Sequence, residues 1–182
     1  RHYRAGGLET LVSRVIGQTV AAERKKAAGT QSSGRRWDEA SFFADAETRC
    51  EPMVLNRLRW ILEWGKTHCA IDWSRGSEKG IFHLRPKGTG TTIGYVESDG
   101  FVWFQIKQLG KLSPFDDEAM RCKLLTRLNQ AFSRPIDEGY IYKEQAGRNL
   151  QYLKDESALE TLLETLKWVI EAIGERQRMT GS

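Results

Sequence analysis

Two residues near the end of a predicted strand have the spacing found in metal-dependent nucleases. Gln105 and Lys107 stand on either side of Ile106, and the alternation of side chains along a strand would place both on one face. Nucleases of the PD-(D/E)XK type use an acid on one strand and an (E/D/Q)xK pair on the next to hold Mg²⁺ and activate water. The acid here would be Asp72 or Asp99. A polar strand end explains the same short motif, because no acidic residue precedes Lys107 by two positions.

The cysteine and histidine residues lack the spacing of a metal site. Cys50, Cys69 and Cys122 form no CxxC pair, and the neighbours His68 and Cys69 would need His83 to complete a zinc site. We therefore predict no metal and no cofactor. The odd number of cysteines argues against a closed set of disulfides and favours a reducing compartment, the cytoplasm.

Two glycine-containing segments, 76–80 and 87–90, invite comparison with phosphate-binding loops. Neither has the GxxxxGK[ST] or GxGxxG pattern, and each joins one predicted strand to another. A phosphate cradle needs the N-terminus of a following helix, so we interpret both segments as hairpin turns.

Aromatic and basic residues share the predicted sheet and could bind nucleic acid without catalysing a reaction. Aromatic rings stack on bases, and neighbouring cations contact phosphates. The candidates in this region are Trp73, Trp103, Arg75 and Lys79. The alternative is that the rings form the core beneath the helices, which must cover one face of the sheet.

Positive charge is concentrated at the start of the sequence. The 182 residues include 28 Lys and Arg against 24 Asp and Glu, and residues 1–36 alone hold eight basic and two acidic residues. The rest of the chain is slightly acidic. A basic arm neutralises DNA phosphates by counterion release, whereas a solvated linker of the same composition needs no ligand, and both interpretations stay open. The candidate DNA contacts in this arm are Arg24, Lys25, Lys26, Arg35 and Arg36.

Composition divides the chain into three parts. Residues 27–34 contain no large apolar side chain, so we assign 1–36 to a basic arm and linker that continues from a preceding region. Residues 37–174 are predicted to form one domain, and 175–182 a frayed tail. No apolar stretch approaches the roughly 20 residues needed to span a bilayer, so no membrane association is expected.

Two helices are predicted before the sheet. Asp38 is a cap for the first, and Pro52 is suited to the first turn of the second. Apolar residues of the second helix recur at helical spacing, at Leu55, Leu58, Ile61 and Leu62. Trp60 and Trp64 are four residues apart on a neighbouring face, and we interpret both as packing residues.

A sheet is predicted between about residues 70 and 107, where the period of the apolar residues changes from 3.6 to 2. Four short runs separated by glycine-bearing turns indicate a four-stranded antiparallel meander, because parallel pairing would need long crossovers. Asp99 and Gly100 supply its last turn. A further strand candidate is the segment 140–142.

Two more helices follow the sheet. The segment 113–116 has the form of a capping box for the first of them. The second is expected to begin at a capping box made by Ser157 and Glu160 and to end at Gly174. Its predicted apolar stripe consists of Leu159, Leu162, Leu163, Leu166, Val169, Ile170 and Ile173. The predicted fold class is therefore α+β: a four-stranded meander with two helices before it and two after it, the helices covering one face.

Several different short motifs are spread along most of the chain. They are VIGQT at 15–19, WDEASFF at 37–43, WSRG at 73–76 with GIF at 80–82, DGFVW at 99–103, PFDD at 114–117 and KWVI at 167–170. In this order they resemble a C-terminal module of uncharacterised bacterial and archaeal proteins. In some of these, the resemblance implies, a restriction-endonuclease-like domain precedes the IGQT segment, and its nuclease residues would lie upstream of Arg1. Ile81 departs from the pattern, which usually has Ser before the Phe.

Two functions of different classes are consistent with these observations. The first is a non-catalytic accessory or interaction module of a larger prokaryotic protein, whose partner is the upstream domain or another protein. Such a module would help a nuclease-like domain engage DNA. The alternative is a degenerate Mg²⁺-dependent nuclease of the PD-(D/E)XK type that uses Gln105 and Lys107 with Asp72 or Asp99.

Overall fold

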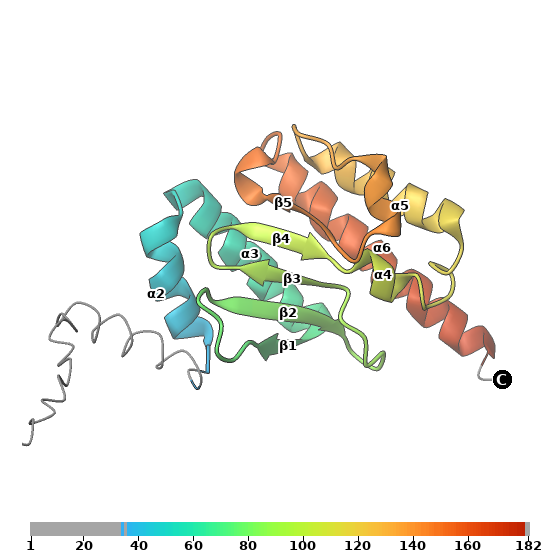
Figure 1. Ribbon diagram of the computed structural model, residues 1–182, viewed down its shortest axis with the longest axis horizontal. Coiled ribbons are helices and arrows are strands. Elements are labelled where there is room, and N and C mark those ends of the chain that lie inside the picture. Colours follow the sequence, from blue (N-terminus) through green and yellow to red (C-terminus); the bar gives the residue numbers. More distant parts are fainter. Residues whose placement is uncertain (1–33, 35, 181–182) are drawn as a thin grey trace, which may run out of the picture.

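The computed structural model describes residue 34 and residues 36–180, in which helices pack against one side of an antiparallel sheet (Figure 1). The predicted α+β class is confirmed. In chain order the elements are α2 (Glu39–Arg49), α3 (Pro52–His68), β1 (Cys69–Trp73), β2 (Ile81–Pro86), β3 (Gly94–Glu97), β4 (Phe101–Phe104), α4 (Ile106–Leu109), α5 (Glu118–Ala131), the 3-10 helix η2 (Glu138–Tyr142), β5 (Ala146–Asn149), the 3-10 helix η3 (Leu150–Tyr152) and α6 (Ser157–Thr180).

The sheet is a meander in which each strand pairs with the next, in the order β1-β2-β3-β4-β5. The four predicted strands are confirmed, and Gly100 has the positive φ of 85° that the β3–β4 turn requires. A fifth strand, β5, pairs with β4 and places Gly147 opposite Trp103. The strand expected at 140–142 is wrong, because this segment lies in η2. The sequence AGRN of β5 has little intrinsic strand preference, so its pairing with β4 decides its conformation.

Strand β4 is shorter than the sequence predicts. It ends at Phe104, and the chain then forms the single turn of α4 from Ile106 to Leu109. Ile106 and Leu109 are both buried. A helical turn brings residues three apart to one side, so both apolar residues reach the core, which an extended strand would not allow.

The two helices before the sheet begin where the sequence predicts. Asp38 Oδ1 accepts a hydrogen bond from Ser41 N at 2.8 Å, and Asp38 N donates to Ser41 Oγ at 3.0 Å, which forms a reciprocal cap for α2. Pro52 opens α3. The packing role predicted for Trp60 is wrong, because 67% of its surface is exposed. Trp64, by contrast, packs against the core.

The start of α5 differs from its prediction. The cap is Asp117, whose Oδ1 accepts from Ala119 N at 3.0 Å, and the helix begins at Glu118. The expected capping box at 113–116 lies before the helix, in turns that include a cis Ser113–Pro114 bond. A carboxylate close to the first helical N–H groups therefore sets the start of α5.

Helix α6 extends past the end predicted for it. At its start Asp155 Oδ1 accepts from Ala158 N at 2.9 Å, so Asp155 takes the capping role expected of Ser157. The helix passes through Gly174 and continues to Thr180, which makes most of the predicted tail helical. Within residues 36–180 no helix combines the length and the apolar character required to cross a membrane.

Helices α3 and α6 lie on the same side of the sheet, and α5 packs against α6 (Figure 1). The strand residues that point toward this side are almost completely buried. They include Phe82, Leu84, Val96, Val102 and Phe104. The α6 residues that share this core are Leu162, Leu166, Val169 and Ile173. The apolar stripe predicted for the last helix is thus the stripe that seals the core.

We expect Leu162→Ala to lower the free energy of unfolding by about 2–5 kcal/mol, because it leaves a cavity at a fully buried site. Urea unfolding followed by circular dichroism measures the change. Leu163→Ala, at a half-buried position next in the sequence, is the control and should cost clearly less. Equal costs for the two variants would contradict the assigned helix face.

Candidate functional site

The acidic residues of the predicted nuclease site are far apart and already paired. Asp72 lies on β1, where its Oδ2 is 2.8 Å from a terminal nitrogen of Arg85. Asp99 lies in the β3–β4 turn, where its Oδ2 is 2.5 Å from Lys79 Nζ. Strand β1 is three strands away from β4, or roughly 14 Å at the usual spacing. Asp72 therefore does not approach the end of β4.

The Gln-x-Lys motif does not lie on a strand. Gln105 precedes α4 and Lys107 lies within it, so the expectation that both side chains share one strand face is wrong. Lys107 Nζ is 2.6 Å from Glu144 Oε1, in an exposed ion pair. Lys107 and Asp99 lie beyond opposite ends of β4. The structure therefore does not bring Asp72, Asp99, Gln105 and Lys107 together around one metal position.

The nucleic-acid candidates are placed in several different ways. Arg24, Lys25, Lys26 and Arg35 lie outside the described residues. Arg36 and Arg75 pair through an antiparallel backbone bridge, which brings two exposed arginines side by side. Lys79 is held by Glu97 and Asp99 and is thus neutralised.

The two candidate tryptophans lie on opposite sides of the sheet. Trp73 packs its ring against Phe42 and Phe82, at centroid distances of 5.6 Å and 5.5 Å. It belongs to the core side, so the expectation that it stacks on bases is wrong. Trp103 points to the other side, next to Tyr95.

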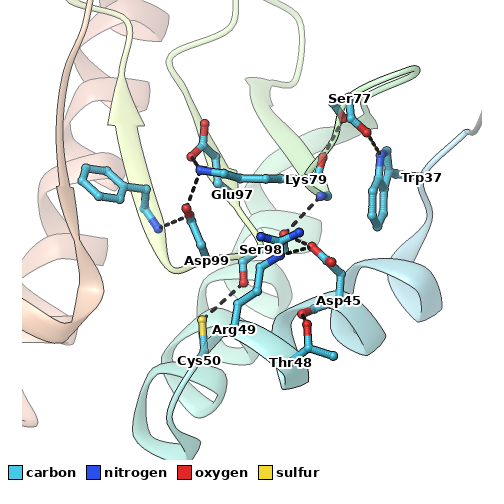
Figure 2. A network of polar contacts seen from close by, with 12 residues as sticks. Trp37, Asp45, Thr48, Arg49, Cys50, Ser77, Lys79, Glu97, Ser98 and Asp99 are labelled. Atoms are coloured by element: carbon cyan, nitrogen blue, oxygen red, sulfur yellow. Dashed lines mark hydrogen bonds and ion pairs between the residues drawn. The ribbon is translucent and has the colours of Figure 1, made fainter. Parts of the chain in front are cut away.

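A polar network joins the β3–β4 turn to α2 and to the loop before β2 (Figure 2). Ser98 is fully buried, and its hydroxyl donates to Asp45 Oδ2 at 2.5 Å and accepts from Gly80 N at 3.1 Å. Cys50 Sγ donates to the Ser98 carbonyl at 3.3 Å, and Arg49 Nε lies 2.9 Å from Asp45 Oδ2. These bonds fix the turn against α2.

Lys79 and Asp99 form the outer part of the same network. Lys79 Nζ contacts both Asp99 and Glu97, and the hydrogen bond with Asp99 is the main reason that its pKa is raised. The Asp99 carbonyl accepts from Asn149 Nδ2 at 2.8 Å, which ties the turn to β5. Both residues are thus engaged in holding the turn rather than available to a metal or a phosphate.

The stability that this network provides depends on pH through the carboxylate of Asp45. Burial acts to raise the pKa of Asp45, but the hydrogen bond from Ser98 and the ion pair with Arg49 outweigh it and hold the pKa below the ordinary value of 3.8. The stabilisation that comes from the ionised carboxylate is therefore complete above about pH 3.8 and is lost as the pH falls through the lower value in the folded protein.

We expect Ser98→Ala to lower the free energy of unfolding by about 1–3 kcal/mol at pH 7, because Asp45 and Gly80 N lose their buried partner. The difference from wild type should shrink when the pH is lowered from about 5 to well below 3.8, because protonation of Asp45 removes the carboxylate that the Ser98 hydroxyl stabilises. Urea unfolding at the two pH values measures it. Thr126→Ala, at an exposed threonine of α5 outside this network, is the control. An equal loss at both pH values would show that packing, not the carboxylate, is responsible.

The side of the sheet opposite α3 and α6, here called the open face, has no helix over it within residues 36–180 (Figure 1). Strand register and alternation determine which side chains point to it. These are Asp72, Ile81, His83, Arg85, Tyr95, Glu97, Phe101 and Trp103. Each of them is half-buried, whereas their inward neighbours on β2 and β4 are buried.

Four rings form a continuous aromatic row across β2, β3 and β4 on the open face. His83 and Tyr95 have centroids 5.6 Å apart, and Tyr95 and Trp103 are stacked at 6.2 Å. Phe101 stacks on Trp103 at 5.1 Å, with an angle of 21° between the planes. The row therefore presents ring surface from three adjacent strands to one side of the molecule.

The fifth strand holds the aromatic row in place. A Cβ at Gly147 would lie 2.5 Å from Cε3 of Trp103, so only glycine lets the indole lie across β5. Tyr95 Oη donates to Gln145 Oε1 at 2.8 Å, in the residue just before β5. The positions of both rings thus depend on a strand that the sequence did not predict.

The open face carries little free charge. Asp72 and Arg85 pair with each other, and Glu97 is bound to Lys79. Burial lowers the pKa of His83, and Arg85 adds to this effect against the opposing influence of Asp72. The His83 ring is therefore neutral at pH 7 and contributes aromatic surface rather than a cation.

Cys50 and Cys69 are placed as packing groups, whereas Cys122 is exposed. Burial raises the pKa of Cys69 to about 11 and also raises that of Cys50, so both thiols are protonated at neutral pH. Among residues 36–180, no three His, Cys, Asp or Glu side chains are grouped to hold a metal ion.

Sequence reasoning named Trp103 but missed His83 and Phe101 as members of the same row. The signal was present in the strand alternation, which places Phe101 and Trp103 of β4 on one face and His83 of β2 on the face opposite its buried neighbours. Comparison of the chain with models of protein families, with curated proteins and with solved structures finds no match.

Proposed function

We propose that this chain is a non-catalytic accessory module of a larger prokaryotic protein and that its open face docks a protein partner. The observation that carries the proposal is the aromatic row, which offers connected ring surface on a side of the sheet that no described helix covers. Tyrosine and tryptophan combine an apolar body with a polar edge, and both are enriched in protein interfaces.

The charges around the row favour a protein over a nucleic acid. Arg85 is neutralised by Asp72, and Lys79 faces the two carboxylates Glu97 and Asp99. A phosphate backbone is bound by cations in excess, since their counterions are what binding releases. A partner surface with its own apolar centre and mixed polar rim fits the open face better. The upstream domain of the same polypeptide and a separate protein both meet this description.

The nuclease alternative has less support in the geometry. Its four residues lie apart, and Asp72, Asp99 and Lys107 are each in an ion pair with another residue. Mg²⁺-dependent cleavage of plasmid DNA that disappears in Lys107→Ala would establish that alternative and overturn the proposal.

We expect a photo-crosslinking amino acid at Tyr95, in the complete protein in its own cells, to give one defined protein crosslink. The same substitution at Tyr142, which is 68% exposed and away from the row, is the matched control and should give no comparable product. Trp103→Ala should reduce the yield at position 95 at least severalfold while circular dichroism confirms the fold. Equal products from both positions, or products with nucleic acid alone, would contradict a protein-docking face.

A second candidate function, contact with DNA, is favoured by one observation. Arg36 and Arg75 lie side by side, are both exposed, and form no ion pair within residues 36–180. Arg36 also continues the basic stretch of residues 1–36. We propose that the arm and this arginine pair together contact DNA phosphates.

We expect Arg75→Ala to weaken binding to a duplex DNA oligonucleotide and to reduce the slope of log affinity against log salt by about one. Fluorescence anisotropy between about 50 and 200 mM salt measures both quantities. Lys87→Ala, in the turn at the other end of β2, is the matched control. Removal of residues 1–36 should abolish most of the binding, and unchanged binding by residues 37–182 would exclude the arm.

A further inference from the structure

A groove lies between α3 and the first half of α6, on the helical side of the molecule. Its volume is about 400 Å³, within the range of pockets that bind ligands and side chains. The walls are mainly Met53, Trp60, Leu159 and Leu163, and Asn56 lies beside them. The groove is separate from the open face, because α3 and α6 pack on the other side of the sheet (Figure 1).

Trp60 and Met53 expose large apolar surface in this groove. Trp60 is 67% exposed and Met53 is 52% exposed. On an amphipathic helix, the residues away from the core are normally polar, so two such side chains beside one groove need an explanation. Tryptophan is also the residue type most enriched among the anchors of protein interfaces, and methionine adapts to varied partners.

The buried side chain of Arg57 stiffens the base of the groove. Only 7% of its surface is exposed, and its Nη1 donates to the Leu150 carbonyl at 2.6 Å. This bond ties α3 to η3, next to the start of α6. Arg57 thus lines the groove as a largely buried side chain whose guanidinium is already bonded to the protein.

The rim of the groove is acidic. Glu156, just before α6, and Glu160, in its first turn, line it and are both exposed. Neither forms an ion pair within residues 36–180. Two free carboxylates beside exposed apolar side chains are complementary to a ligand that has an apolar stripe flanked by cations.

We propose that this groove binds an amphipathic helix of a protein partner, with its apolar stripe on Trp60 and Met53 and with Lys or Arg side chains against Glu156 and Glu160. A helix lying in a groove presents apolar residues at i, i+3, i+4 and i+7, which matches walls supplied by two helices. This second docking site uses a different surface from the open face and goes beyond the function proposed above.

The test uses a displayed library of helical peptides, selected against the folded chain with circular dichroism as a check on each variant. We expect enriched peptides to carry apolar residues at helical spacing, flanked by Lys or Arg. Trp60→Ala should weaken the best peptide at least tenfold. The matched control Tyr142→Ala, at a residue of equal exposure, should leave its affinity unchanged.

Further variants separate the contribution of the acidic rim from that of the apolar walls. Glu156→Gln with Glu160→Gln should weaken the peptide severalfold and flatten its salt dependence. Met53→Ala should weaken it, whereas Met179→Ala, at an exposed methionine near the end of α6, should not. Trp103→Ala, on the open face, should have no effect, so failure here is distinguishable from failure of the proposed function.

Several outcomes would overturn the proposal. One is the absence of enriched peptides, and another is enrichment of peptides without cations or of peptides that bind Trp60→Ala equally well. A concentration-dependent dimer in analytical ultracentrifugation that Trp60→Ala abolishes would assign the groove to a second copy of the chain instead.

Discussion

Side chains of the antiparallel sheet alternate between its two faces, and the rest of this structure depends on that constraint. Alternation sends Phe82, Val96 and Val102 toward the helices, where they are buried, and turns Tyr95 and Trp103 to the other side. The helices cover only the residues of the first set. The aromatic row is therefore a direct consequence of strand register, and a shift of one residue in β2, β3 or β4 would turn the ring or rings of that strand toward the helices.

Polar side chains near the sheet bond mainly to one another and hold its turns in place. Ser98 and Asp45 fix the β3–β4 turn to α2, and Lys79 closes the same turn through Asp99. Asp45, Asp99 and Lys79 are residue types that a hydrolytic enzyme could use, but each is bonded to another side chain. Apolar surface that no described element covers, by contrast, occurs on both sides of the molecule, with aromatic rings on one and the α3–α6 groove on the other.

Local rules predicted most of the elements but few of their ends. The Asp38 cap, Pro52 and the Gly100 turn are where the sequence places them, because each depends on bonds within a few residues. The ends of β4 and α6 were wrong. Burial of Ile106 against the core curls the chain into α4, and α6 continues through Gly174 although glycine is a weak helix former.

The sequence by itself determined the α+β class, the meander and the inward stripe of α6, since periodicity and turn residues act over short distances. Tertiary structure alone decided the fifth strand, the placement of Trp103 over Gly147 and the exposure of Trp60. These features depend on which distant segments meet. Contacts of that kind are set by the packing of the whole core, and a pattern within one segment does not contain them.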